Sequence, residues 1–494
     1  MLAKRTQNYG KTLVALILGA LIFRWFIVFN SPLGLHGDEA QYWSWSQNLD
    51  WGYFSKPPLI AWIIAISTSL FGQAEWAIRL PSAFIHSLTT ALIYITAKQA
   101  FDERTGFWAA CTYLAMPAVW LSSTIISTDV PLLFCWALAL NAWVALRKTA
   151  SWSRILQLGV AIGFGLLAKY AMMFFFPVIL LAILFDRPTR QALLSIKGLA
   201  CVAIIAGLFI PNIVWNLNHD FATLSHTAEN ANLSGPLINP SELLSFWVDQ
   251  LGVFGPLSFP LLIIALFNLR TFSVFGKWLC LLAIVPLIVI SSQALLSRAN
   301  ANWAVSAYIA APIVVAIFVL TRPKLLPFLK WGLIGQSAVM ITLGLTLLSP
   351  PLTDMFGLSN SVKRLRAWPN TITRIEALYE AGYDGQAYEA IAIDNRLVFY
   401  DATYYGLPDK APLKMWKLSK TPGNHAEMTQ PLEVNEGPIL LLNHYEGYSR
   451  FFEEDFSKLI ELSPLSIPLG GGKTRDLRVW VGYGYTPTQK ARKL

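Results

Sequence analysis

The sequence has little charge and few residues that could bind a metal or form a disulfide. Only 14% of its 494 residues are charged, whereas soluble domains carry about a quarter. The four cysteines have no CxxC spacing and all lie in apolar runs, so neither a disulfide framework nor a thiolate zinc site is expected. The net charge of +9 is not gathered into one basic patch. No nucleic-acid partner is therefore predicted.

Apolar residues, by contrast, are abundant. They make up 55% of the chain, and the mean hydropathy is +0.48. We count about eleven apolar runs that could cross a hydrocarbon core roughly 30 Å thick, near 12–30, 78–99, 105–123, 129–146, 155–168, 170–185, 198–216, 248–267, 275–292, 302–320 and 330–349. The fifth and sixth runs are short and could be one span broken around Lys169. The sequence thus predicts an α-helical polytopic membrane protein.

The distribution of lysine and arginine predicts how these spans are oriented. Alternate loops are rich in cations, while the opposite loops carry only Lys56, Arg79, Lys169 and Arg298. Because cytoplasmic loops are enriched in lysine and arginine, we expect a cytoplasmic N-terminus and an external loop at 36–58. An odd number of spans also places everything after Ser349 outside.

The composition changes at Pro350-Pro351, which divides the chain into a transmembrane domain, 1–349, and a soluble α/β domain, 350–494. In the second part we predict a helix over 370–382 with Thr371 as its cap. Short apolar runs predict buried strands at Ala390–Ile393, Leu397–Tyr400, Ile439–Leu442 and Leu477–Gly482. The glycines at 470–472 lack the remaining positions of a phosphate loop and predict a turn.

Residues capable of catalysis gather at the span ends that we place outside. The first external loop carries Asp38, Glu39 and Lys56, later span ends carry Asp129, Lys169 and Arg298, and His226 lies in the loop before the eighth span. The three acids are predicted to be catalytic. The predicted substrate contacts are Tyr53, Lys56, Lys169, His226 and Arg298. A carboxylate can deprotonate a hydroxyl, and cations can stabilise a departing phosphate. Lys56 precedes Pro57-Pro58, which suit a helix start, so a phosphate there would meet both an ammonium and a helix N-terminus. The set suits transfer of a group, such as a sugar, from a lipid phosphate.

Each of these residues also has a structural interpretation. Asp38 and Asp129 could cap helices. Glu39 could simply be an acid that the dipole of its helix favours in the first turn, or it could orient its neighbour. Lys56, Lys169 and Arg298 could simply reach the membrane surface. His226 is seven residues from His219, a spacing typical of ordinary loop histidines rather than a metal site.

Aromatic residues surround the acidic pair of the first loop. Tyr42, Trp43, Trp45 and Trp51 predict an interfacial belt on a helix lying along the membrane. The same rings could also line the path of a lipid tail, and the two interpretations are compatible.

Three motifs together resemble a known family. They are Asp38-Glu39, then Gly52-Tyr53-Phe54 with Lys56-Pro57-Pro58, then Ser127-Thr128-Asp129. In this order they are similar to the GT-C membrane glycosyltransferases, above all to bacterial members of the protein O-mannosyltransferase superfamily that include the aminoarabinose transferases of lipid A. The resemblance covers roughly the first 220 residues by motif, and farther on it rests mainly on hydropathy.

The resemblance implies an inverting transfer from a polyprenyl-phosphate sugar to an acceptor on the periplasmic side of a bacterial inner membrane. It assigns Asp38 as the catalytic aspartate, Asp129 as a second external aspartate, and Lys56, in the motif with Tyr53, as the phosphate contact. Ser55 stands where the aminoarabinose transferases carry a glutamate described as a metal ligand. No cofactor is therefore predicted, and a need for a divalent metal is left open without support from the sequence.

The resemblance leaves the acceptor and the reaction class open. The partners expected are the lipid-linked sugar donor, membrane lipids, and a lipid A or lipopolysaccharide acceptor, with a protein acceptor as an alternative. A transporter or flippase for a lipid-linked sugar is the competing class, favoured mainly by Lys169 between two short spans.

Overall fold

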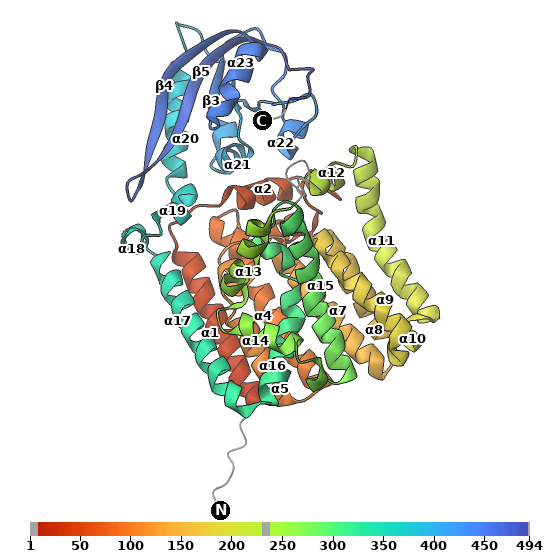
Figure 1. Ribbon diagram of the computed structural model, residues 1–494. Coiled ribbons are helices and arrows are strands. Elements are labelled where there is room, and N and C mark those ends of the chain that lie inside the picture. The colour runs from red at the N-terminus through yellow and green to blue at the C-terminus, as the bar shows by residue number, and fades with distance from the viewer. Residues whose placement is uncertain (1–7, 230–237, 493–494) are drawn as a thin grey trace, which may run out of the picture. The chain divides into compact units, whose positions relative to one another are not determined.

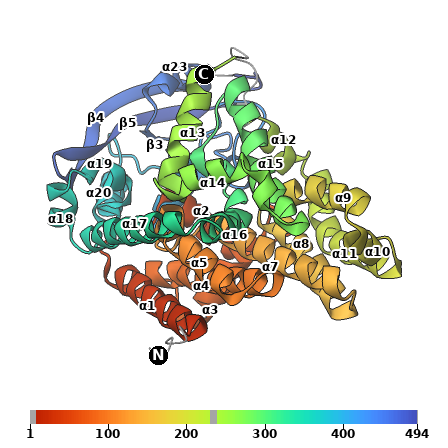
Figure 2. The ribbon, with the colours of Figure 1, turned by 60° about the horizontal axis from the view of Figure 1, so that its bottom comes forward.

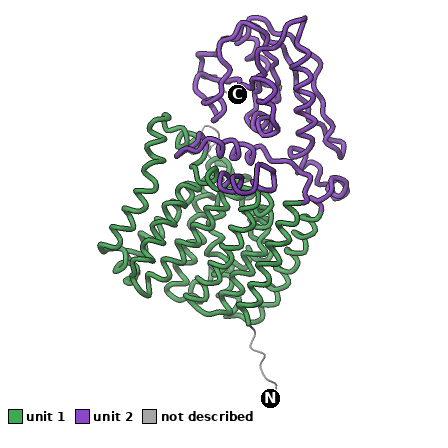
Figure 3. Tube along the Cα trace, turned by 180° about the vertical axis from the view of Figure 1, so that it is seen from behind, with its two compact units in different colours: residues 1–29, 56–63, 79–345 green, residues 30–55, 64–78, 346–494 purple. Residues whose placement is uncertain are grey.

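The computed structural model describes residues 8–229 and 238–492, which divide into two compact units (Figures 1 and 3). The helical unit comprises residues up to 29, 56–63 and 79–345. The sheet unit comprises residues 30–55, 64–78 and 346–494. The loop that carries Asp38 is thus grouped with the C-terminal part of the chain rather than with the membrane helices that flank it in the sequence.

The described residues up to Thr346 fold mainly into helices. In chain order they are α1 (Tyr9–Asn30), α2 (Gly37–Ser46), α3 (Leu59–Phe71), α4 (Glu75–Ala100), α5 (Glu103–Leu114), α6 (Pro117–Ser122), α7 (Asp129–Lys148), α8 (Trp152–Ala168), α9 (Phe175–Phe185), α10 (Arg187–Leu193), α11 (Ile196–Asn218), α12 (Ala222–Glu229), α13 (Pro240–Phe254), α14 (Ser258–Leu266), α15 (Val274–Leu296), α16 (Ala307–Leu320) and α17 (Leu326–Thr346). The sequence prediction of a helical membrane part is confirmed.

Fewer helices are long enough to cross a membrane than the eleven spans that the sequence predicts. In the described parts of the chain, six helices are long and apolar enough to cross a membrane, or up to eight if each bent pair counts as one span. The span predicted at 248–267 is not one straight helix, because α13 and α14 bend by 116° around Gly255, whose φ of 117° suits glycine. The prediction of about eleven spans is not confirmed.

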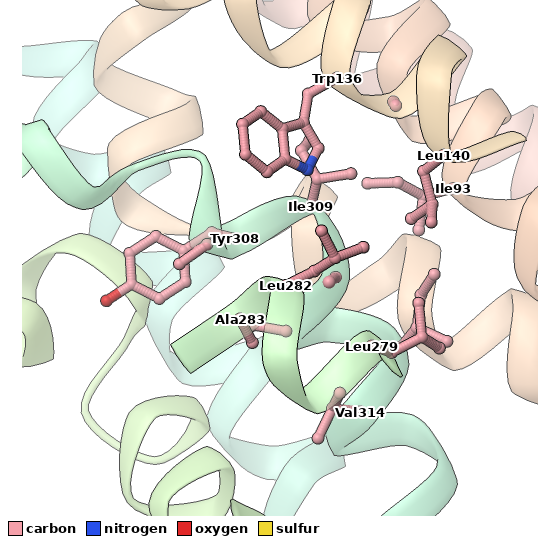
Figure 4. Packing of buried hydrophobic residues seen from close by; sticks show 14 of the residues in the cluster. Ile93, Trp136, Leu140, Leu279, Leu282, Ala283, Tyr308, Ile309 and Val314 are labelled. Atoms are coloured by element: carbon pink, nitrogen blue, oxygen red, sulfur yellow. The ribbon is translucent and has the colours of Figure 1, made fainter. Parts of the chain in front are cut away.

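The core of the helical unit lies between α4, α7, α15 and α16 (Figure 4). Trp136 and Leu140 of α7 face Leu279 and Leu282 of α15 in this view. Helix α7 is buried almost throughout, and α8 lies beside it in both Figure 1 and Figure 2. Because α7 is so enclosed, the residues at its N-terminal end are held by a rigid element.

The sheet unit contains five strands in the order β2-β1-β3-β5-β4. They are β1 (Ala390–Ile393), β2 (Leu413–Met415), β3 (Ile439–Asn443), β4 (Phe456–Gly470) and β5 (Lys473–Tyr485). Strand β1 pairs in parallel with both β2 and β3, with Ile391 opposite Leu413 and Leu440, while β5 runs antiparallel to β3 and β4. Both β1 and β3 are wholly buried, as expected for parallel strands covered on two faces.

Helices complete the sheet unit, and the longest is α20 (Trp368–Ala381). The shorter ones are α18 (Pro350–Met355), α19 (Ser359–Val362), α21 (Arg396–Tyr404), α22 (His425–Thr429) and α23 (Ser449–Asp455). The predicted strands at β1, β3 and β5 are confirmed, as is the glycine turn between β4 and β5.

Two local predictions in this unit are wrong. The run Leu397–Tyr400 is part of α21, because Asn395 accepts hydrogen bonds from the first backbone amides of the helix and starts it there. Thr371 is not a cap, since α20 begins at Trp368 after Ala367 and Thr371 is buried in its second turn.

Candidate active site

Asp38 lies in the first turn of α2 without capping that helix. The N-cap is His36, whose Nδ1 atom accepts from the Asp38 amide at 3.2 Å. The capping interpretation of Asp38 is therefore wrong, and its carboxylate is available for other partners. Its Oδ1 atom lies 3.0 Å from Nη1 of Arg396 on α21, and its side chain is 43% exposed. Asp38 is an accessible carboxylate whose orientation is fixed by an arginine.

Glu39 has a different environment from its neighbour. It is 2% exposed, and its Oε2 atom accepts from the His36 backbone amide at 3.0 Å, which completes a capping box. This contact favours the orienting role for Glu39 over direct proton transfer. Its catalytic role stays a prediction.

Arg396 is the residue that sequence analysis missed. Its Nη1 atom donates to Asp38 and also to Oε1 of Gln41, one turn along α2. The approach of α21 to α2 is close, since a Cβ on Gly37 would lie 2.7 Å from Cβ of Leu397. Because 358 residues separate Asp38 and Arg396, no local pattern in the sequence could pair them.

Tyr53 and the aromatic residues of α2 stabilise the loop that follows the acidic pair. Tyr53 is 1% exposed, stacks on Trp45 with ring centroids 4.6 Å apart, and places its hydroxyl 3.0 Å from the Trp45 carbonyl. The predicted interfacial belt is wrong for Tyr42 and Trp45, which are buried inside the unit. A substrate contact by Tyr53 stays a prediction, and its packing indicates a role in ordering the loop.

Lys56 belongs to the helical unit and precedes α3. The first hydrogen bonds of this helix run from the backbone amides of Ala61 and Trp62 to the Pro58 carbonyl. An apolar cavity of about 270 Å³ lies among α3, α4, α7 and α8. Its lining includes Leu59, three residues after Lys56, and Pro131, two residues after Asp129. The helix start predicted after Lys56 is confirmed, and it adjoins a cavity that suits a hydrocarbon chain.

Asp129 and Lys169, singled out separately by the sequence, form an ion pair. Nζ of Lys169 lies 2.6 Å from Oδ1 of Asp129, and the two side chains are 18% and 10% exposed. Nδ2 of Asn302 donates to the other carboxylate oxygen at 2.7 Å. The N-cap of α7 is Thr128, so the capping interpretation of Asp129 is wrong. The cluster ties the start of α7 to the break after α8 and to the short 3-10 helix Ala301–Ala304 that precedes α16.

We expect loss of either charge in this cluster to destabilise the helical unit. Asp129→Asn or Lys169→Met leaves one buried ion without its partner, which costs about 3–5 kcal/mol. Unfolding in detergent, followed by circular dichroism, measures the loss. The double variant should lose less unfolding free energy than the two single variants lose together, because it retains no uncompensated charge. Additive losses would show that the two charges do not stabilise each other.

The two remaining predicted residues are His226 and Arg298. His226 is half-buried on α12, and Arg298 is exposed between α15 and α16. Among the described residues, no group of three histidine, cysteine, aspartate or glutamate side chains could hold a metal ion. The roles of His226 and Arg298 in substrate binding stay predictions.

Comparisons with known proteins cover both units. A family model described as dolichyl-phosphate-mannose-protein mannosyltransferase matches residues 55–215. The lipid A galacturonosyltransferase RgtD of Rhizobium johnstonii is 36% identical over 344 residues, which are 69% of this chain and 70% of that protein. An undecaprenyl phosphate-alpha-4-amino-4-deoxy-L-arabinose arabinosyl transferase of Proteus mirabilis is 30% identical over 227 residues, 42% of this chain and 40% of that protein.

A solved structure shows the same fold. ArnT from Cupriavidus metallidurans in the apo state has a TM-score of 0.65 at 16% identity, over 96% of this chain and 98% of that one. Its structure bound to undecaprenyl phosphate has a TM-score of 0.63 at 15% identity, over 95% and 97%. The apolar helices and these relatives indicate a multi-pass protein of the inner membrane. Since the match to RgtD extends over most of both chains, this chain is a membrane glycosyltransferase of the GT-C superfamily and belongs to the family that contains the lipid A galacturonosyltransferases.

Proposed function

We propose that this protein transfers a sugar from a polyprenyl-phosphate donor to lipid A, with the reaction on the periplasmic side of the inner membrane. The observation that carries the proposal is the Asp38 carboxylate, accessible and oriented by Arg396, in a chain related over most of its length to a lipid A galacturonosyltransferase. The relation to RgtD favours a uronic acid as the sugar. An N-terminus in the cytoplasm is part of the same proposal.

The reaction needs a base and a group that stabilises the leaving phosphate. In our proposal, Asp38 accepts the proton of an acceptor hydroxyl while the hydroxyl oxygen bonds to the anomeric carbon. The bond from that carbon to the phosphate oxygen breaks, and its electron pair leaves with the polyprenyl phosphate. The phosphate charge rises from one toward two, so a cation at Lys56 stabilises the transition state more than the bound donor.

The apolar cavity beside the start of α3 supports the donor assignment. A polyprenyl chain needs an apolar path close to the group that binds its phosphate. The cavity lining contains Leu59, Ile63, Phe134 and Phe164. An apolar cavity lined by Leu59, three residues after Lys56, fits a lipid whose phosphate lies before the start of α3.

The sequence left two alternatives, a flippase and a transferase with a protein acceptor. The flippase class is set aside, because the relatives that match this chain are transferases by name. A protein acceptor remains the second candidate, since the family model matched by residues 55–215 is named for protein mannosyltransferases.

We expect purified protein in proteoliposomes to convert undecaprenyl-phosphate galacturonic acid and lipid A into galacturonosylated lipid A and free undecaprenyl phosphate. Mass spectrometry of the lipids measures both products. A matched donor that carries 4-amino-4-deoxy-L-arabinose shows which sugar the protein prefers. A peptide acceptor shows whether the sugar is transferred to protein instead of lipid A. Release of undecaprenyl phosphate with modified peptide and unmodified lipid A would refute the proposed acceptor.

A further inference from the structure

The sheet unit contains a cavity at the carboxyl ends of two neighbouring parallel strands. Asn395 follows β1, and His444 and Tyr445 follow β3, and all three line the cavity. In open sheets with parallel strands, ligands bind outside the carboxyl ends of the strands. The volume is about 160 Å³, close to a cavity of roughly 150 Å³ that holds benzene. It has room for one six-membered ring.

The two strand ends are joined by a buried carboxylate. Asp394 is 5% exposed and accepts from the backbone amides of His444 at 2.8 Å and Tyr445 at 3.1 Å. Nδ2 of Asn443 donates to the same carboxylate at 2.7 Å. Because these bonds hold both loops, the cavity is preformed rather than assembled by a ligand.

Two arginines give the cavity a positive charge. Arg475 is 7% exposed, and Nη1 donates to Oγ1 of Thr371 at 2.6 Å while Nη2 donates to the Arg366 carbonyl at 3.0 Å. Its guanidinium carbon lies 3.7 Å from the ring centroid of Trp368. Burial lowers the pKa of Arg475 only to about 10, so it stays charged at neutral pH. Arg364 lines the same cavity and is exposed.

One polar group in the cavity is buried without a partner. Asp401 on α21 lines the cavity, is 3% exposed, and its Oδ1 atom makes no hydrogen bond to the residues that the structure describes. Burial raises the pKa of Asp401 well above its usual value, against the opposing effect of Arg475. The unpaired Oδ1 atom of Asp401 can accept a hydrogen bond from a hydroxyl group of a bound sugar.

We propose that this cavity binds one anionic sugar group, with Arg364 and Arg475 contacting its phosphate or carboxylate. Two substrates of the proposed reaction offer that chemistry: the phosphorylated glucosamine of a lipid A acceptor and the uronic acid of the donor. The choice between these sources rests on the proposed function, whereas binding of an anionic sugar does not. The cavity uses none of the groups that we assign to the chemical step.

Direct binding to the full-length protein in detergent tests this site. Isothermal titration with glucosamine 1-phosphate, galacturonate and neutral N-acetylglucosamine compares the two sources with an uncharged ring. We choose Arg364→Met, because the Arg364 side chain makes no hydrogen bond or ion pair to the described residues, whereas Arg475 holds backbone carbonyls that support α20. Arg374→Met, an exposed arginine of α20 outside the cavity, is the matched control.

We expect Arg364→Met to weaken binding of an anionic sugar by about tenfold, since one hydrogen bond to a charged group is lost. Arg374→Met should bind as the unchanged protein does, and N-acetylglucosamine should bind weakly to all three proteins. A preference for glucosamine 1-phosphate assigns the cavity to the acceptor, and a preference for galacturonate assigns it to the donor.

Equal binding by the unchanged protein and Arg364→Met, an equal loss in Arg374→Met, or no binding of either anion would overturn the proposal. The readout needs no sugar transfer. A protein that binds the anion but leaves lipid A unmodified would therefore refute the proposed function and retain this site.

Discussion

Replacing Asp38 by Asn is expected to lower kcat by about 10²–10⁴-fold, because an amide cannot accept the proton of the acceptor hydroxyl. The Asn oxygen can still accept from Nη1 of Arg396, so α2 and α21 should remain paired. Initial rates of lipid A modification in proteoliposomes, taken at saturating donor and acceptor, measure the loss. Circular dichroism and the melting temperature show whether the variant is folded.

Two controls separate a base from a structural carboxylate. Arg396→Met removes the ion pair but leaves the carboxylate, so we expect a smaller fall in kcat, on the order of tenfold, from lost orientation. Asp384→Asn makes the same chemical change in an exposed turn of the sheet unit, at a φ of 50° that Asn tolerates. If Arg396→Met lost as much activity as Asp38→Asn, the ion pair rather than proton transfer would explain Asp38.

The fold was predictable where the pattern of the sequence is long or fully buried. Long apolar runs predicted α1, α7 and α15, and the runs at Ala390–Ile393 and Ile439–Leu442 predicted the buried strands. The failures have local causes. Four apolar residues at Leu397–Tyr400 suit a strand or a buried helix equally. They form a helix because the Asn395 side chain caps its first backbone amides.

The candidate site was predictable residue by residue, but its pairings were not. Asp129 and Lys169 each stood out as a charge at a span end, yet their contact depends on how α7 and α8 pack. For Glu39 the sequence left a catalytic and an orienting role open, and the capping box with His36 favours the orienting role. Arg396 and Arg475 gave no signal, because an arginine in a soluble α/β region is ordinary until the fold brings it to a carboxylate or a cavity.

The second large effect is expected at Lys56. Lys56→Met should lower kcat/KM by about 10²–10³-fold, because the departing phosphate loses a cation at the moment when its charge increases. The loss should fall mainly on kcat, since the bound donor carries less charge on the phosphate than the transition state does. Lys56→Arg keeps the positive charge and should retain most of the activity if charge alone is required.

Rapid-quench measurement of undecaprenyl phosphate release in a single turnover isolates the chemical step from substrate binding. Lys277→Met makes the same substitution at an exposed position on α15 and should react at the normal rate. A cation that only anchors the protein to the membrane surface would leave the single-turnover rate unchanged in Lys56→Met. A normal rate in that variant, with the donor at saturation, would therefore remove Lys56 from the reaction and shift the search for the phosphate contact to Arg298, which the sequence also predicts as a substrate contact.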